Sequence, residues 1–244
     1  MRHRMLVLSA FTLTLLAGLP AAATSIYFND FQGAVGSEWS QATVTTVASR
    51  TFLGPFGNQT VSLTLSNLPV HSHIVLAFDL YILGSWDGNN GTNGDAFKVA
   101  VGGTTLINTT FANSTSSSTI QSYPDPYLAS NPKLTGAIEH DVLTGVLAGV
   151  NVNGESLYHL SFDFVHTASS IVLNFSSATS AHPDERFGLD NVSLENTPVP
   201  EPSTLLLLGS GLAGLGAWRR MRKGIGNPSL WLSWGTLSKI YRGC

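Results

Sequence analysis

The sequence has little charge and almost no cysteine. Charged side chains account for 11% of the 244 residues, and the formal net charge is −3. Chains that bind nucleic acid carry a clear surplus of lysine and arginine, so we expect no nucleic-acid partner. The one cysteine is Cys244, so no disulfide forms within the chain. Its thiol is either a lipidated or reactive group or an inert tail residue.

The sequence also lacks the motifs of common enzymes. It contains no G-x-S-x-G nucleophile motif, no phosphate-binding loop and no dinucleotide fingerprint. The closest histidine spacing is His71-x-His73, which follows Pro69 and is more typical of a solvated turn than of a zinc site. Lysine is scarce while Ser, Thr, Asn and Gly are abundant, which favours an extracellular β protein over a cytoplasmic enzyme. We therefore expect a non-enzymatic protein.

The N-terminus has the three parts of a secretory signal. "MRHRM" is basic, "LVLSAFTLTLLAGL" is apolar, and "PAAA" places Ala21 and Ala23 in an A-x-A arrangement. We expect residues 1–23 to direct the chain to the secretion machinery, and signal peptidase to cleave after Ala23. The alternative is an uncleaved membrane anchor, which the short apolar stretch and the adjacent small residues disfavour.

A second apolar segment lies near the other end of the chain. It runs from Thr204 to Trp218, which is fifteen residues, whereas a full span normally needs about 17 to 25. A basic cluster follows it directly: Arg219, Arg220, Arg222 and Lys223. Such a cluster keeps its side of the segment in the cytoplasm. We expect a transmembrane helix in the inner membrane, with the preceding residues outside.

A proline-rich strip comes before this segment. Pro198, Pro200 and Pro202 hold the backbone extended, and Glu201 is the one charge among them. The Pro200-Glu201-Pro202 triplet, the apolar "GLAGLGA" and the basic "RRMRK" together resemble the PEP-CTERM protein-sorting domain. The alternative is a permanent anchor with an incidental proline linker.

This resemblance covers residues 197–223 and implies a partner and a destination. In this family of Gram-negative proteins, a membrane enzyme called exosortase recognises the Pro-Glu-Pro region, cleaves near it and transfers the body outward. The resemblance therefore implies transient anchoring and then the cell surface, the outer membrane or the extracellular matrix, where such bacteria make exopolysaccharide. Residues 224–244 depart from the family pattern. They either lie on the inner face of the membrane or reflect a frame error in the gene.

Residues 24–196 form the exported body, and their dominant period is two. In "HIVLAFDLYIL" (73–83) the even-numbered residues are apolar, and "SLYHLSFDFV" (156–165) repeats the pattern. Further strands are expected at 60–65, 96–102, 170–176 and 187–195. Clusters of Gly, Asn, Ser and Pro separate them, as turns require. Strands with one apolar face pack as two sheets, so we predict an all-β fold, a β-sandwich of the jelly-roll type.

Three stretches of the body carry a weaker resemblance. "YFNDFQG", "SWDGNNGTNGDAFKV" and "FGLDNVSL" are similar to jelly-roll modules of the carbohydrate-binding and lectin-like type. The resemblance implies that the first and last strands pair, and that acidic residues beside them hold a structural calcium ion. We expect no other cofactor.

The first candidate site is Asp30 with Asp190 and Asn191. Calcium binds about six to eight oxygens, which carboxylates, amides and carbonyls supply. The apolar phase of the last strand changes between Leu189 and Val192, which predicts a β-bulge at Asp190-Asn191. The alternative is that these polar side chains make Asx hydrogen bonds to the backbone at strand ends.

The second candidate site is the loop "SWDGNNGTNGDAF" (85–97). Its composition resembles a calcium loop, with the oxygen-bearing residues Asp87, Asn89, Asn90, Asn93 and Asp95. It does not have the EF-hand spacing, because Lys98 stands where the twelfth-position glutamate is required. Trp86 beside the loop has the right chemistry to stack on a sugar ring. The alternative is a hairpin loop with a half-buried tryptophan.

The third candidate site is an outward row of four residues on two strands: Asp79, Tyr81, His159 and Asp163. On neighbouring strands they would form a polar platform. Its two carboxylates suggest a glycosidase pair, but no sequence feature sets the separation that such a pair needs. The alternative is a solvated sheet face.

Three functions are consistent with these features of the sequence. The body is a non-enzymatic envelope or matrix protein that binds polysaccharide, a secreted glycan hydrolase or lyase of jelly-roll fold, or a purely structural surface protein. Topology, the sorting resemblance and the missing catalytic motifs favour the first.

Overall fold

The structure is a computed structural model of the whole chain. It describes residues 23–89, 94–114, 118–143, 146–147, 150–151, 154–179, 184–197 and 203–224. The chain divides into two compact units, residues 1–199 and residues 200–244.

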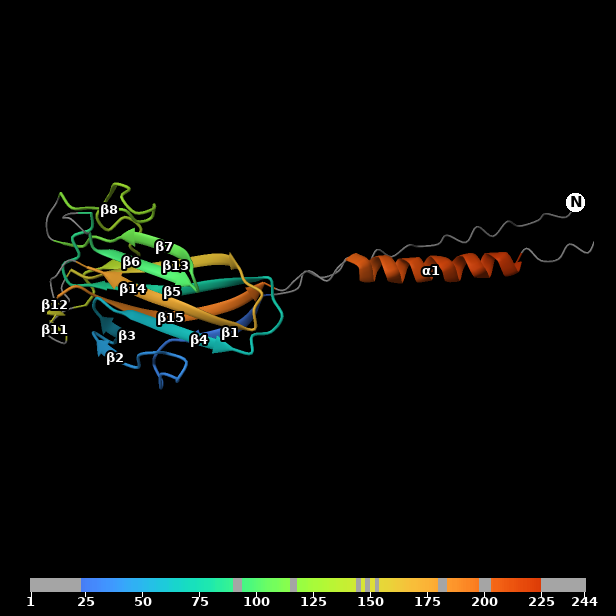
Figure 1. Cartoon of the computed structure of the whole chain (residues 1–244), viewed down its shortest axis with the longest axis horizontal. Coiled ribbons are helices and arrows are strands. Elements are labelled where there is room, and N and C mark those ends of the chain that lie inside the picture. Colours follow the sequence, from blue (N-terminus) through green and yellow to red (C-terminus); the bar gives the residue numbers. More distant parts are fainter. Residues whose placement is uncertain are drawn as a thin grey trace, which may run out of the picture. The chain divides into compact units, whose positions relative to one another are not determined.

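The regular elements described in the first unit are all strands, and they lie in the body, between Thr24 and Thr197 (Figure 1). The longer ones are β1 (Thr24–Asn29), β2 (Val44–Val47), β3 (Arg50–Phe56), β4 (Thr60–Ser66), β5 (His73–Leu83), β6 (Ala96–Val101), β7 (Thr104–Thr110), β13 (Ser156–Val165), β14 (Ser170–Ala178) and β15 (Arg186–Thr197). The two-residue strands are β8 (Ile120–Gln121), β9 (Asn131–Pro132), β10 (Glu139–His140), β11 (Val146–Leu147) and β12 (Val150–Asn151). The expected strands 73–83 and 156–165 are confirmed to the residue, as β5 and β13.

The strands form two main antiparallel sheets. The seven-stranded sheet has the order β10-β13-β5-β15-β3-β2, with β1 also paired to β15, and the four-stranded sheet has the order β4-β14-β6-β7. Strand β15 pairs with β5 on one side, and on its other side with β3 and then with β1. The expected pairing of the first and last strands is therefore confirmed. The sandwich-like arrangement is confirmed as well, and its jelly-roll type stays a prediction.

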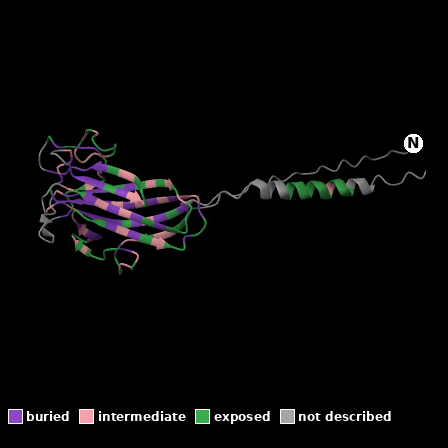
Figure 2. Ribbon diagram, viewed as in Figure 1, coloured by how far each residue is buried: buried purple, intermediate pink, exposed green. Residues whose placement is uncertain are grey.

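The core lies between the two sheets and consists of the apolar faces that the period of two predicts. In β5, every even-numbered side chain from Ile74 to Ile82 is fully buried. Along the longer strands, buried residues alternate with less buried ones (Figure 2). Aromatic rings meet across the sandwich, and the ring of Phe78 lies edge-on to that of Phe175 with 5.2 Å between centroids. All members of this core lie between Phe31 and Leu194. The body thus holds its own hydrophobic core, as an independently folding domain does.

A second, smaller cluster lies on the opposite face of the seven-stranded sheet. It consists of Phe52, Tyr81, Leu83, Leu143 and Leu157, and it covers one end of that face. Tyr81 is only 2% exposed, and its ring stacks on that of Phe52 with 4.8 Å between centroids. The expectation that Tyr81 belongs to a solvated polar row is therefore wrong. Alternation sets the face on which a residue lies, but not whether other segments cover that face.

The second unit contains helix α1 (Ser203–Gly224). The helix expected for the apolar segment is therefore confirmed, with Arg219 and Arg220 exposed near its C-terminal end and Arg222 and Lys223 in its last turn. Among the described residues, no helix combines the length and the apolarity that crossing a membrane requires. The passage of this segment through a membrane stays a prediction.

Several predicted features fall on residues that the structure does not describe. These are most of the signal peptide with Ala21, the triplet Pro200, Glu201 and Pro202, and the tail after residue 224. Ala23, where cleavage is expected, is exposed.

Candidate functional site

The predicted β-bulge in the last strand is present. The register of β15 against β5 shifts between Asp190 and Ser193, and Asn191 adopts a positive φ of 50°. Oδ1 of Asp190 accepts a hydrogen bond from the backbone N–H of Asn191 at 2.7 Å, and Oδ1 of Asp30 accepts one from the N–H of Gln32 at 3.1 Å. These are hydrogen bonds of the Asx kind that we set against the calcium interpretation. Calcium binding by Asp30, Asp190 and Asn191 stays a prediction.

The bulge brings the first and third candidate sites together at Asp79. One carboxylate oxygen of Asp79 lies 2.7 Å from Nδ1 of His159, and the other accepts a hydrogen bond from Nδ2 of Asn191 at 2.8 Å. His159, Asp79 and Asn191 thus form a hydrogen-bonded array across β13, β5 and β15. Sequence reasoning had assigned these residues to two separate sites.

The remaining member of the predicted row, Asp163, lies apart from this array. It faces Val75 in the pairing of β13 with β5, whereas His159 faces Asp79. Four residues along a strand correspond to about 13 Å. The carboxyl groups of a glycosidase pair lie about 5 to 9.5 Å apart. Asp79 and Asp163 therefore do not have the spacing of such a pair.

The acid groups around the array influence each other. Burial raises the pKa of Asp190 to about 6. The hydrogen bond from Asn191 opposes this shift, and the nearby charges of Asp79 and Asp30 add to it. This part of the sheet therefore disfavours further negative charge.

Trp86 in the second candidate site is not available to a ligand. Its side chain is fully buried in the sandwich core, and its indole N–H donates to the carbonyl oxygens of Leu83 at 3.0 Å and Arg186 at 3.1 Å. The expectation that Trp86 stacks on a sugar ring is therefore wrong. A tryptophan with its N–H satisfied by the backbone at the end of two strands contributes to folding instead.

The amide of Asn89 is hydrogen-bonded to neighbouring segments of the chain. Nδ2 donates to the carbonyl oxygen of Ala129 at 2.5 Å, and Oδ1 accepts hydrogen bonds from the hydroxyl groups of Ser122 and Thr110. Asn90 and Asn93 lie outside the described residues.

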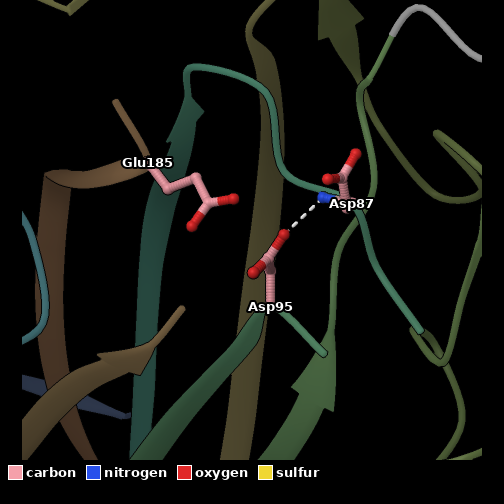
Figure 3. A group of neighbouring side chains, drawn as sticks. All are labelled: Asp87, Asp95 and Glu185. Carbon is pink, nitrogen blue, oxygen red and sulfur yellow. Dashed lines mark hydrogen bonds between the residues drawn. The ribbon is translucent and has the colours of Figure 1, made fainter. Parts of the chain in front are cut away.

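The two aspartates of the loop form an acidic cluster with a residue that sequence reasoning missed. One oxygen each from Asp87, Asp95 and Glu185 lie within 4.8 Å of one another (Figure 3). Asp95 and Glu185 are each only 1% exposed. The backbone N–H of Asp87 donates to the carboxylate of Asp95. We call these three residues the acidic cluster.

Glu185 reaches the cluster because of the pairing between β5 and β15. Arg186 at the start of β15 faces Leu83 at the end of β5, so the residue before Arg186 lies beside the loop that follows Leu83. The signal for this site was the acidic pair Asp184-Glu185 directly before the last strand. This pair could be assigned to the site only with the knowledge that β5 and β15 are neighbours.

The electrostatics of the cluster allow two states. Burial raises the pKa of Glu185 to about 8, and the charge of Asp95 and a hydrogen bond with it contribute. At neutral pH Glu185 therefore keeps its proton and is hydrogen-bonded to Asp95. Alternatively, a cation replaces that proton. Because all three donors are carboxylate oxygens, they suit a hard ion such as calcium better than zinc.

Comparison with known proteins identifies the C-terminal segment. Residues 198–223 match the PEP-CTERM protein-sorting motif. No curated protein matches the chain.

The body is similar to several solved structures at low identity. One is the CBM22-1 xylan-binding domain of Paenibacillus barcinonensis Xyn10C, with 11% identity, a TM-score of 0.38, and coverage of 73% of this chain and 98% of that one. Another is a family 35 carbohydrate-binding module from an environmental isolate, with 9% identity, a TM-score of 0.28, and coverage of 74% and 93%. The Agl-KA catalytic domain has 14% identity, a TM-score of 0.30, and coverage of 73% and 28%. What the comparisons establish is that the chain carries a PEP-CTERM protein-sorting motif at residues 198–223.

Proposed function

We propose that the protein is exported through the inner membrane, held there by its C-terminal segment, cleaved by exosortase and released to the cell surface or matrix. The observation that carries this proposal is the PEP-CTERM motif at residues 198–223. The motif continues into helix α1, which begins directly after Pro202. Prolines are disfavoured in helix interiors, so the sequence of the Pro-Glu-Pro triplet favours extended backbone, which a cleaving enzyme can bind.

The test is the mass of the mature protein in cells with and without the exosortase gene. With the enzyme, we expect a body that starts at Thr24 and ends near Pro200 to Pro202. Without it, we expect the helix to remain attached. Glu201→Ala should reduce cleavage, whereas Glu195→Ala in the body should not. Equal masses in both strains would contradict the proposal.

The released body is proposed to be a non-enzymatic protein that retains polysaccharide. Support comes from the seven-stranded sheet, where polar side chains on three adjacent strands form a hydrogen-bonded array. The alternative of a glycan hydrolase or lyase predicts turnover of polysaccharide by residues 24–197, although Asp79 and Asp163 lie too far apart to act as its carboxyl pair. Binding without turnover favours a binding protein, and neither binding nor turnover favours a purely structural one.

A structural calcium ion is part of this proposal. The acidic cluster offers three carboxylate oxygens to it, and a cation among them offsets their mutual repulsion. We expect millimolar calcium to raise the melting temperature of residues 24–197, since a ligand that binds only the folded state at 100 times its Kd adds about 2.7 kcal/mol. Asp95→Asn should remove the effect. An unchanged melting temperature in the unsubstituted body would exclude this ion.

A further inference from the structure

One face of the seven-stranded sheet is open at the end away from Tyr81. Four residues in a row across it are direct neighbours on adjacent strands: Phe28 on β1, Ser193 on β15, Ala77 on β5 and Ser161 on β13. Ala77 lies between the buried residues Leu76 and Phe78, so alternation points it away from the core. Paired residues share a face, and the whole row therefore points outward. We call this part of the sheet the open face.

The open face presents an aromatic ring to solvent. Phe28 is 59% exposed at one edge of it, although a phenylalanine gains about 1.5 to 3 kcal/mol when it is buried. Its neighbours in the row are serine and alanine, whose short side chains leave the ring uncovered. Exposed aromatic rings of this kind stack against the apolar side of a sugar ring.

Carboxylates border the row on both sides. On one side, Asp190 faces Asp79, and Asp79 faces His159. On the other side, Glu195 and Asp163 both face Val75. Residues two apart on one face of a strand are separated by about 7 Å, so these carboxylates lie within reach of a chain that lies on the row.

Acidic residues outnumber basic ones in the whole body, as they do on the open face. Residues 24–196 contain four Lys or Arg and fourteen Asp or Glu, a formal net charge of −10. The one arginine on the neighbouring strand, Arg50, pairs with Glu139 at 2.5 Å. An acidic polysaccharide is repelled by such a surface, whereas a cationic one is attracted to it over about 10 Å at 0.1 M salt.

We propose that the open face binds a linear polysaccharide that carries protonated amino groups. Phe28 stacks on a sugar ring, and ammonium groups donate charge-assisted hydrogen bonds to Asp79 and Asp163 on the two sides of the row. This proposal rests on the proposed polysaccharide-binding function and adds the place and the charge of the ligand. A neutral glycan and a second copy of this chain are the competing occupants.

The test is titration calorimetry with residues 24–197, which hold the whole core. The probes are a fully deacetylated glucosamine hexamer, its N-acetylated counterpart, a neutral glucan oligomer and a polyuronate oligomer. We expect the amino hexamer to bind at least about tenfold more tightly than the others, a difference of about 1.4 kcal/mol. Its affinity should fall severalfold near 1 M salt, where the Debye length is about 3 Å.

Two substitutions and two matched controls test the place. Phe28→Ala and Asp163→Asn should each weaken binding of the amino hexamer by about threefold to tenfold, which corresponds to about 0.7 to 1.4 kcal/mol. Val172→Ala removes a side chain that is 41% exposed on the other sheet, and Asp125→Asn removes an exposed carboxylate from a loop. Both controls should bind as the unsubstituted body does. Melting temperatures verify that each variant is folded.

Each other result overturns the proposal in a distinguishable way. Equal binding of the N-acetylated or neutral oligomer removes the amino-group specificity and leaves the polysaccharide-binding function in place. Unchanged binding by folded Phe28→Ala and Asp163→Asn removes the open face as the site. Binding of no glycan removes polysaccharide binding as a whole, while exosortase cleavage is measured separately. A dimer in sedimentation that Phe28→Ala dissociates assigns the face to a second copy of the chain.

Discussion

Glu185 illustrates how a single buried carboxyl group makes stability depend on pH. Its pKa is about 8 in the folded body and near 4.5 in an unfolded chain, because folding buries it beside Asp95. A group with a raised pKa in the folded state stabilises that state fully below about pH 4.5. The stabilisation is lost progressively as pH rises from about 4.5 to about 8. In this range the unfolded chain has released its proton, so folding must either take up a proton from solution or bury a charge.

We therefore predict that the calcium-free body loses stability between about pH 5 and about pH 8, by at most about 1.4 kcal/mol per pH unit from this group. Urea unfolding of residues 24–197 in the presence of a chelator measures it. Glu185→Gln is the matched control, because its amide is neutral at both pH values and still donates to Asp95. A slope that Glu185→Gln leaves unchanged would show that another group titrates. In calcium the slope should flatten, since the ion replaces the proton.

The neighbouring residue Trp86 shows what composition alone does not reveal. Its position beside a loop rich in Asp, Asn and Gly suggested a sugar-stacking residue, yet the side chain lies in the core. The preference of a loop for polar residues says nothing about the direction in which the side chain of Trp86 points. That direction depends on the backbone carbonyls of Leu83 and Arg186, which come together only when β5 and β15 pair.

Strand β15 pairs with β5, β3 and β1, and it places Asn191 in the hydrogen-bonded array and Glu185, directly before it, in the acidic cluster. Its bulge separates the part that pairs with β3 from the part that pairs with β1, and places Asn191 against Asp79. Asn191 has a φ of 50°, a conformation that asparagine and glycine tolerate and β-branched residues do not.

We predict that Asn191→Val destabilises the body more than Asn191→Gly, by about 1 to 2 kcal/mol. Both variants lose the hydrogen bond to Asp79, so their difference isolates the backbone conformation from the side-chain contact. Urea unfolding of the two variants gives the comparison. Equal stabilities would mean that the bulge relaxes to an ordinary strand when the side chain changes.

The bounds of the main strands could largely be predicted from the sequence, whereas the pairing of distant strands could not. A local period of two predicted the exact bounds of β5 and β13, and a break in that period predicted the bulge at Asp190-Asn191. The pairing of β5 with β15 joins residues more than 100 positions apart, and no local pattern encodes it. Glu185 and the link between Asp79 and Asn191 were missed for this reason, because both exist only across that pair.

At the scale of the whole molecule, charge is divided between two parts of the chain. The body has a formal net charge of −10, whereas helix α1 holds four basic residues and no acidic one. Basic residues at one end of an apolar segment resist transfer across the inner membrane, whereas acidic residues contribute little. The basic end of helix α1 is therefore consistent with the proposed orientation, in which this end is inside.

Neutralising the basic cluster should expose the C-terminal end of the chain to protease added outside the inner membrane. We predict that an epitope tag placed after Lys223 is protected from protease in spheroplasts of a strain that lacks exosortase, because Arg219, Arg220, Arg222 and Lys223 hold that end in the cytoplasm.

Replacing all four with Gln removes the barrier of about 2.5 to 3.5 kcal/mol that each charge presents at the membrane centre, so the tag should become accessible. Replacing Lys98 and Lys133 in the body with Gln is the control, since they lie outside the apolar segment and its flank, and the tag should stay protected. Protease digestion of the tag in the unsubstituted protein would place both ends of the helix outside. The segment would then not hold the chain in the inner membrane for cleavage by exosortase, which contradicts the proposal.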